Sequence, residues 1–215
     1  MRQMAEVPRK MRRVEGVTFQ KMLGTGGGAG YSHRPDFRTY ALLTVWDSRE
    51  KAYGFESRSA VMDHLRSRTR EIYSLFLVPV SSRGRWSRKE PFRPVMPDRP
   101  DSRLAVLTRA TIKPRFYIPF WKRVGRVSRS QEGRPGLLFS KGVGERPWIM
   151  QATFTVWESV SQMEDFAHDP EGYHSEAVST TRRLGGFREE LYARFHLLDV
   201  RGTWRGTAPA GEQGL

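Results

Sequence analysis

Runs of β-branched and aromatic residues mark the predicted strands of this chain. Residues 40–46 and 151–157 are rich in the side chains that strands favour, and both runs end in tryptophan. Apolar runs at residues 72–80, 104–112 and 191–200 predict three more strands. The pattern therefore indicates a substantial sheet.

Two segments of the chain repeat the same order of features. The pattern Phe-x-Lys-x-x-Gly begins at Phe19 and again at Phe139. In each copy a predicted strand then closes on a tryptophan, and a phenylalanine follows nine residues later. A polar helical stretch and a last apolar strand complete both copies. Residues 19–86 and 139–204 are thus two copies of one supersecondary unit.

The segments between the strands predict short helices. A capping box at Ser159 opens one helix, and a second helix is expected at residues 173–184. With the strand at 104–112, the second copy has the order strand, helix, strand, strand, helix, strand, which is the ferredoxin-like arrangement. The first copy begins at its helix, residues 3–15, and lacks the first strand. Either its sheet is incomplete, or a short upstream piece is absent from this sequence.

These patterns predict an α+β fold made of two tandem ferredoxin-like repeats. Residues 1–86 form the first repeat, which is incomplete at its N-terminal end, and residues 104–204 form the second. The intervening residues 87–103 are rich in proline and arginine and are interpreted as a linker. Residues 205–215 are expected to be a flexible tail.

Composition narrows the class of protein. The 215 residues include 37 basic and 23 acidic side chains, a net charge of +14, and no cysteine. The absence of cysteine excludes disulfides, thiolate metal sites and cysteine nucleophiles. No apolar run approaches the length of a transmembrane segment, and the N-terminus does not resemble a signal peptide, so we expect a soluble, cytoplasmic protein.

The excess of positive charge suits nucleic acid, an anionic membrane surface or an acidic protein partner. Thirty of the basic residues are arginine, and they are spread along the whole chain. Because no helix-turn-helix, RNA-recognition or KH pattern is present, the sequence does not favour nucleic-acid binding, and a general preference for arginine would also explain the charge.

Among the five histidines, His174 is distinctive. At helical offsets of three, four and seven it is followed by Ala177, Val178 and Thr181, which are small or apolar, whereas the same offsets from His64 are polar or charged. The helix face of His174 is therefore expected to look into the fold. A single inward histidine is more often structural than a ligand, so both interpretations remain open at this point.

Five segments of the second half resemble the spheroidene monooxygenase family of carotenoid biosynthesis. These are residues 107–112 with the downstream Phe120 and Trp121, and residues 136–145, 151–157, 174–178 and 189–195. The similarity extends over residues 3–204. This family is similar to the dimeric α+β barrel superfamily, whose haem-binding members include chlorite dismutases, dye-decolourising peroxidases and aldoxime dehydratases.

The resemblance implies that the two repeats form an α+β barrel, and it implies a cofactor and its ligand. In the haem-binding relatives a histidine on the helix of the second repeat holds the iron, which corresponds to His174 here. The expected cofactors are haem b and O2 with an external electron donor. The expected partners are a small-molecule substrate, an acidic ferredoxin or other reductant, and a second copy of the chain in a homodimer.

Further residues follow from the same resemblance. Arg109 and Arg194, both on strands predicted to face inward, are candidates for hydrogen bonds to oxygen in the distal pocket or to haem propionates. Lys21 and Lys141, at equivalent places in the two copies, are weaker candidates for the propionates, since a lysine near a strand end is usually just solvated. Ala177, Val178 and Phe187 are the remaining expected cofactor contacts.

The leading hypothesis is a haem-dependent monooxygenase that oxidises a small apolar or natural-product metabolite. Two other enzymes fit a similar fold, namely a haem-dependent dehydratase of the aldoxime dehydratase type and a cofactor-free α+β barrel monooxygenase. The non-enzymatic alternative is a basic protein that binds nucleic acid or anionic lipid.

Overall fold

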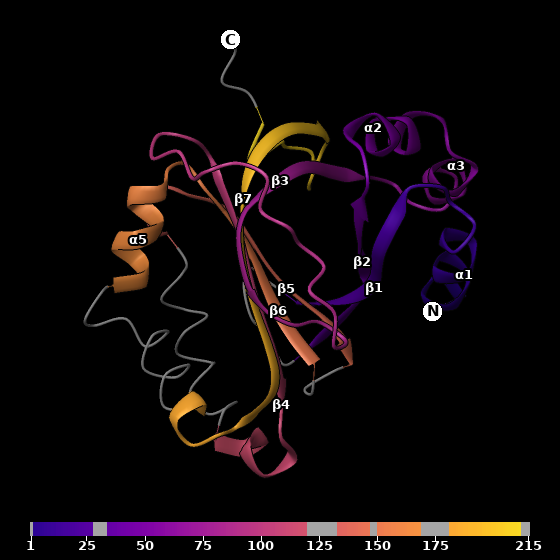
Figure 1. The fold of residues 1–215 in the computed structure, drawn as a ribbon. Helices are drawn as coiled ribbons and strands as arrows, with labels where there is room; N and C mark the ends of the chain where they lie inside the picture. The colour runs from indigo at the N-terminus through magenta and orange to yellow at the C-terminus, as the bar shows by residue number, and fades with distance from the viewer. Residues whose placement is uncertain (1, 28–33, 120–132, 147–149, 169–180, 212–215) are drawn as a thin grey trace.

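The computed structural model describes residues 2–27, 34–119, 133–146, 150–168 and 181–211. Seven strands form one curled antiparallel sheet in the order β2-β1-β5-β6-β4-β7-β3, and the helices lie outside it (Figure 1). The strands are β1 (Val17–Gly26), β2 (Pro35–Trp46), β3 (Tyr73–Gly84), β4 (Leu104–Ile112), β5 (Leu137–Arg146), β6 (Met150–Trp157) and β7 (Phe187–Gly202). The helices are α1 (Arg2–Met11), α2 (Arg49–Arg58), α3 (Ala60–Arg66), the short η1 (Pro114–Phe116) and α5 (Val160–His168).

The order of the strands confirms the predicted α+β class and its two repeats. Within the second repeat the neighbours are β5, β6, β4 and β7, so the first strand of the repeat lies between the third and the fourth, as in ferredoxin-like sheets. The first repeat contributes β1, β2 and β3. No described residue pairs with the outer edges of β2 and β3, where the first strand of that repeat would lie.

The two repeats also pack alike in detail. Trp46 at the end of β2 contacts Phe55 of α2 with ring centroids 5.0 Å apart, and Trp157 at the end of β6 contacts Phe166 of α5 at 5.2 Å. Each indole N–H donates to the threonine two residues earlier, at 3.0 and 2.9 Å respectively. The sequence repeat is therefore a repeat of side-chain packing, in which a tryptophan fixes a helix against its sheet.

The strands differ from their predicted bounds mainly in length. The strand predicted at 104–112 coincides with β4, whereas β2 begins at Pro35, five residues before the prediction. The register of β1 and β2 shifts after Gly24, and Thr25 then pairs with Asp36. This pairing extends the hairpin of β1 and β2 beyond its apolar part. Apolar periodicity could not reveal this extension, because its residues are polar or exposed.

The helices of the first repeat are shorter than the pattern predicts. The first ends at Met11 rather than near residue 15, and the polar stretch after β2 divides into α2 and α3, which are capped by Ser48 and Ser59. In the second repeat Ser159 caps α5 as expected, since its hydroxyl accepts the backbone N–H of Gln162 at 3.3 Å. Most of the helix predicted at 173–184, and the stretch around Phe120, lie outside the described residues.

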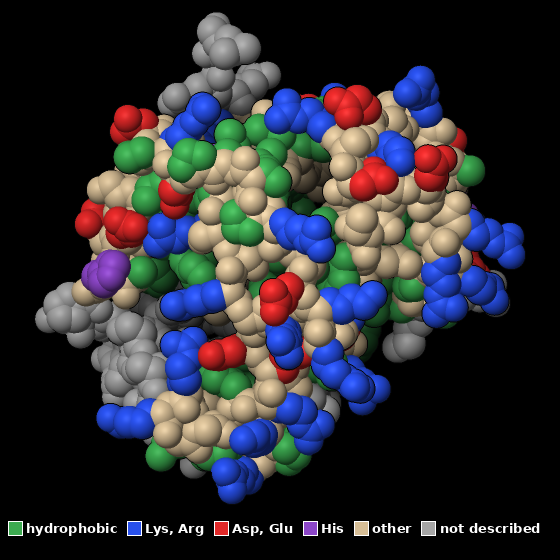
Figure 2. Space-filling model, in the orientation of Figure 1, with side chains coloured by type: hydrophobic (Ala, Val, Ile, Leu, Met, Phe, Trp, Pro, Cys, Tyr) green, Lys and Arg blue, Asp and Glu red, His purple; other side chains and the backbone are tan. Residues whose placement is uncertain are grey.

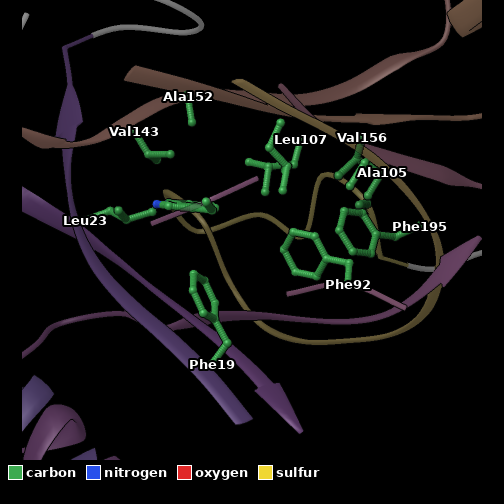
Figure 3. Close-up of a cluster of buried hydrophobic side chains, with 13 residues drawn as sticks. Phe19, Leu23, Phe92, Ala105, Leu107, Val143, Ala152, Val156 and Phe195 are labelled. Atoms are coloured by element: carbon green, nitrogen blue, oxygen red, sulfur yellow. The ribbon is translucent and has the colours of Figure 1, made fainter. Parts of the chain in front are cut away.

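The largest apolar cluster fills the concave side of the sheet, and Figure 3 shows its side chains converging from several strands. Phe92, from the segment interpreted as a linker, is 5% exposed and packs edge-on against Phe195 of β7, with centroids 4.9 Å apart. Residues 87–103 thus contain no helix or strand of their own but contribute a core side chain. The composition of this segment did not predict the burial of Phe92, because a single phenylalanine hardly changes the proline- and arginine-rich character of the segment.

Within the described parts of the chain, no helix has the length and apolar character needed to cross a membrane.

Candidate functional site

Charged side chains interrupt the apolar concave side of the sheet. Lys21 of β1, Arg109 of β4, Glu145 of β5 and Glu189 of β7 occupy the same faces of their strands as buried members of the main cluster. Leu107, two residues before Arg109, illustrates the rule, since residues i and i+2 point to the same face. Strand periodicity thereby brings four charges from four strands to one place.

Arg109 is the centre of this group. Its side chain is 2% exposed, and its guanidinium donates to a carboxylate oxygen of Glu189 and lies 3.7 Å from Glu145 Oε2. The guanidinium carbon is 5.5 Å from the ring centroid of Trp86. Within the described residues the Nε of Arg109 has no hydrogen-bond partner. A buried guanidinium needs such carboxylates, because burial of an unpaired charge is very costly.

Glu145 joins Lys21 to this arginine. One of its carboxylate oxygens accepts from Lys21 Nζ, and the other accepts from the indole N–H of Trp86 at 2.8 Å. Lys21 Nζ also donates to Ser87 Oγ at 2.7 Å. The structure therefore brings together two of the predicted cations, Lys21 and Arg109, and balances them with two carboxylates.

Glu189 connects the cluster to the turn that follows β3. Its carboxylate accepts the backbone N–H groups of Ser87 and Arg88, at 3.0 and 2.7 Å, in addition to Arg109. Burial raises the pKa of Glu189, but these hydrogen bonds and the charge of Arg109 outweigh it and hold the pKa below its usual value. The ionised carboxylate of Glu189 thus connects β7 to Arg109 of β4 and to the turn after β3.

Lys141 occupies the equivalent place in the second copy but has different surroundings. It is 4% exposed, and its Nζ lies 5.4 Å from the ring centroid of Trp204. Burial lowers the pKa of Lys141, while the negative charge of Asp36 opposes this effect. The position that corresponds to Glu145 is Thr25 in the first copy, so the glutamate bridge seen at Lys21 is not repeated here.

Arg194 does not join Arg109, because alternate residues of β7 point to opposite faces. Its neighbours Ala193 and Phe195 belong to the concave cluster, whereas Arg194 faces the side covered by α5. There it pairs with Asp98 and Glu164, at 3.1 and 3.2 Å. The expectation that both arginines face inward therefore holds for Arg109 alone.

Burial lowers the pKa of Arg194, but hydrogen bonds with Tyr192, Asp98 and Glu164 outweigh this and raise it. The guanidinium is consequently always charged.

The described histidines lie away from the concave side. His64 Nε2 in α3 is 3.6 Å from a carboxylate oxygen of Glu6, and His168 at the end of α5 has its Nδ1 2.9 Å from the carbonyl oxygen of Glu164. His196 shares the face of Arg194, with Nε2 3.3 Å from the carbonyl oxygen of Pro97.

The Nδ1 of His196 is buried and has no hydrogen-bond partner in the described part of the chain. The same part contains no cluster of three or more acidic or histidine side chains suited to a metal ion.

The remaining predicted residues fall into two groups. His174, Ala177 and Val178 lie outside the described residues. Phe187 begins β7 and packs with Ile112 and neighbouring aromatic residues in a small cluster of its own.

Sequence reasoning missed Glu145, Glu189 and Trp86. Two signals were available. Glu145 stands where the first copy has Thr25, directly after the shared Phe-x-Lys-x-x-Gly pattern, and Trp86 and Trp204 end the two copies at matching positions. The role of Glu189 could not be foreseen, because it depends on a turn more than 100 residues away in the chain.

The fold and the site together define an α+β protein of two ferredoxin-like repeats, with separate charged groups on the two faces of its sheet. No family model matches the chain. It is 36% identical over 201 residues to a protein of Rhodobacter capsulatus named "Spheroidene monooxygenase", covering 93% of this chain and 83% of that protein. The chain belongs to the spheroidene monooxygenase family.

A second relative of the same name, from Cereibacter sphaeroides, is 38% identical over 194 residues. The match covers 90% of this chain, and the chain spans 60% of that relative's length. Among solved structures, an anthrone oxidase-like protein aligns over 96% of this chain and 89% of its own, with a TM-score of 0.37 and 13% sequence identity.

Proposed function

We propose that this chain is a monooxygenase that inserts one oxygen atom into an apolar carotenoid. The observation that carries the proposal is the 36% identity to the Rhodobacter capsulatus relative, over 83% of that protein. In such a reaction one atom of O2 enters the substrate and the other leaves as water. Two electrons and two protons must be supplied, and an acidic ferredoxin suits a chain with a net charge of +14.

We assign the haem of this proposal to the face of the sheet that α5 covers. His174, the proposed iron ligand, follows the end of α5 by six residues in the sequence. Arg194 lies on the face that α5 covers, and His196, two residues later on β7, shares that face. Arg109, Lys21 and Lys141 lie on the concave face, and a sheet separates the two groups. In this proposal the haem shares the α5 face with Arg194, and Arg109 on the other face is not assigned to it.

The α5 face is apolar around Arg194. Apolar side chains of β4, β6 and α5 pack there, including Val106, Trp157 and Met163. Arg194 would be the residue to hold a haem propionate there, because its guanidinium is always charged and already donates to carboxylates of Asp98 and of Glu164 in α5. When bound, haem would supply the activation of O2 for insertion into the substrate.

In this proposal the charged residues of the concave face stabilise the sheet and do not contact the haem. Arg109, Glu145 and Glu189 tie β4, β5 and β7 to the turn after β3, and so keep the shape of the sheet that presents Arg194 on its other face. Lys141 is a further buried cation on that side, near the negative charge of Asp36.

Haem binding tests this proposal. The purified chain mixed with haemin should develop a Soret band, which His174→Ala should abolish. Arg194→Met should retain the band but lose most of the oxygenation, because the charged hydrogen-bond donor assigned to the cofactor site is removed. The matched control is His168→Ala, at the exposed end of α5, which should leave both unchanged. A full Soret band in His174→Ala, or none in the wild type, would contradict the assignment.

A further inference from the structure

Two apolar side chains are exposed together with a group of cations at one end of the molecule. This is the end where β4 runs into η1 and where the chain enters β7, at the bottom of Figure 1. Ile118 is 72% exposed and Leu184 is 53% exposed. The segments that carry these two side chains also carry basic and no acidic residues, a combination typical of an interfacial surface.

The two segments of this end are held side by side. The backbone N–H of Lys113 donates to the carbonyl oxygen of Gly186 at 2.9 Å, and its Nζ donates to that of Gly185 at 2.7 Å. Beneath them, Ile112 packs with Phe116 and Phe187. Ile118 and Leu184 do not belong to this cluster and are exposed.

All the charges on these two segments are positive. Residues 113–118 and 181–188 contain five basic residues and no acidic one. Figure 2 shows Lys and Arg side chains gathered at this end, with hydrophobic side chains among them. Arg182 is paired with Glu190 from the adjoining strand, whereas Arg115 lies over the ring of Phe116 at 5.0 Å. We call the surface of Lys113, Arg115, Ile118, Arg182, Arg183 and Leu184 the basic tip.

We propose that the basic tip docks on a bilayer that contains anionic lipids. Ile118 and Leu184 insert at the level of the headgroups, and the arginines contact lipid phosphates. This combination favours a bilayer over an acidic protein, because a lipid interface accepts scattered apolar side chains and anionic contacts at once. The proposal does not depend on the enzymatic reaction, and it can hold or fail whatever the cofactor is.

Flotation with lipid vesicles tests the apolar part of the tip. The wild-type chain should bind vesicles of phosphatidylcholine mixed with phosphatidylglycerol, and not vesicles of phosphatidylcholine alone. The double variant Ile118→Ser/Leu184→Ser should bind at least about tenfold more weakly. The control Phe37→Ser/Val95→Ser removes two side chains that are 63% and 71% exposed elsewhere, and it should bind like the wild type.

The charged part has its own pair of variants. Arg115→Gln/Arg183→Gln should weaken binding by roughly thirtyfold and make it less sensitive to salt, since each of the two cations contributes about 1 kcal/mol near an anionic surface. Arg68→Gln/Arg70→Gln, which removes two exposed arginines between α3 and β3, should change little. Equal losses in the tip variants and their controls would overturn the proposal. So would a wild-type chain that ignores anionic vesicles and binds an acidic protein through the tip.

Discussion

At the scale of single residues, neighbouring glutamates on β7 differ sharply in what they hold. Glu189 points to the concave side and holds the buried Arg109 together with two backbone N–H groups. Glu190 points the other way and pairs with Arg182, whose side chain is 50% exposed. Exposed pairs contribute little to stability, whereas loss of one partner of a buried pair leaves a charge without compensation.

Replacement of Glu189 should therefore destabilise the fold far more than replacement of its neighbour. We expect Glu189→Gln to lower the free energy of unfolding by about 2–4 kcal/mol, because the charge of Arg109 loses its main counterion. Glu190→Gln should cost about 0–1 kcal/mol. Urea denaturation of both variants at pH 7 measures the difference, and equal effects would mean that the cluster does not stabilise the sheet.

The contribution of Glu189 to the free energy of unfolding should also depend on pH. The pKa of Glu189 is lower in the folded chain than its usual value of 4.5, so the unfolded chain binds the proton more readily. The stabilisation is thus complete above pH 4.5 and is lost as the pH falls through the folded pKa. The gap between wild type and Glu189→Gln should accordingly shrink in acid.

At the scale of elements, both repeats end in the same turn. A tryptophan follows the last strand of each repeat, and it pairs with the residue three positions later, as Trp86 does with Lys89. A glutamate from elsewhere accepts backbone N–H groups of each turn, Glu189 in the first repeat and Glu71 in the second. The sequence repeat therefore includes the turns and the carboxylates that fasten them.

A glycine at the start of the second turn should be indispensable. Gly202 has a φ of +74°, and a Cβ there would lie 2.0 Å from the carbonyl oxygen of Ile72. Gly202→Ala should cost about 3 kcal/mol or more, because strain in the left-handed region adds to a clash with backbone. Gly133 has the same φ, with nothing within 4 Å of a Cβ, so Gly133→Ala should cost only about 1 kcal/mol. Thermal unfolding of the two variants measures both effects. Gly133→Ala reports the backbone strain alone, and Gly202→Ala reports the strain together with the steric clash.

The strands and the repeat could be predicted from the sequence because tryptophan and β-branched residues recur at matching intervals. The face of Arg194 could not, since both faces of β7 are covered and its residues do not alternate clearly between apolar and polar. The Glu145 bridge and the burial of Phe92 depend on contacts between distant segments. Local pattern carries no information on such contacts.

At the scale of the whole molecule, the sheet separates two kinds of positive charge. On the concave side Lys21 and Arg109 are balanced by Glu145 and Glu189, so they serve the fold. On the α5 side Arg194 is held between Asp98 and Glu164, facing the element that leads towards His174. Much of the remaining net charge of +14 lies at the surface, available to a bilayer or an electron donor.

The source of the inserted oxygen tests the central claim most directly. The wild-type chain, loaded with haemin and supplied with reduced ferredoxin, is incubated briefly with spheroidene under 18O2, and the product is analysed by mass spectrometry. A monooxygenase should give a product with one 18O atom per oxygen inserted, and no label when 18O is present only in water. An unlabelled product under 18O2, or no oxygenated product with a fully loaded chain, would contradict the account.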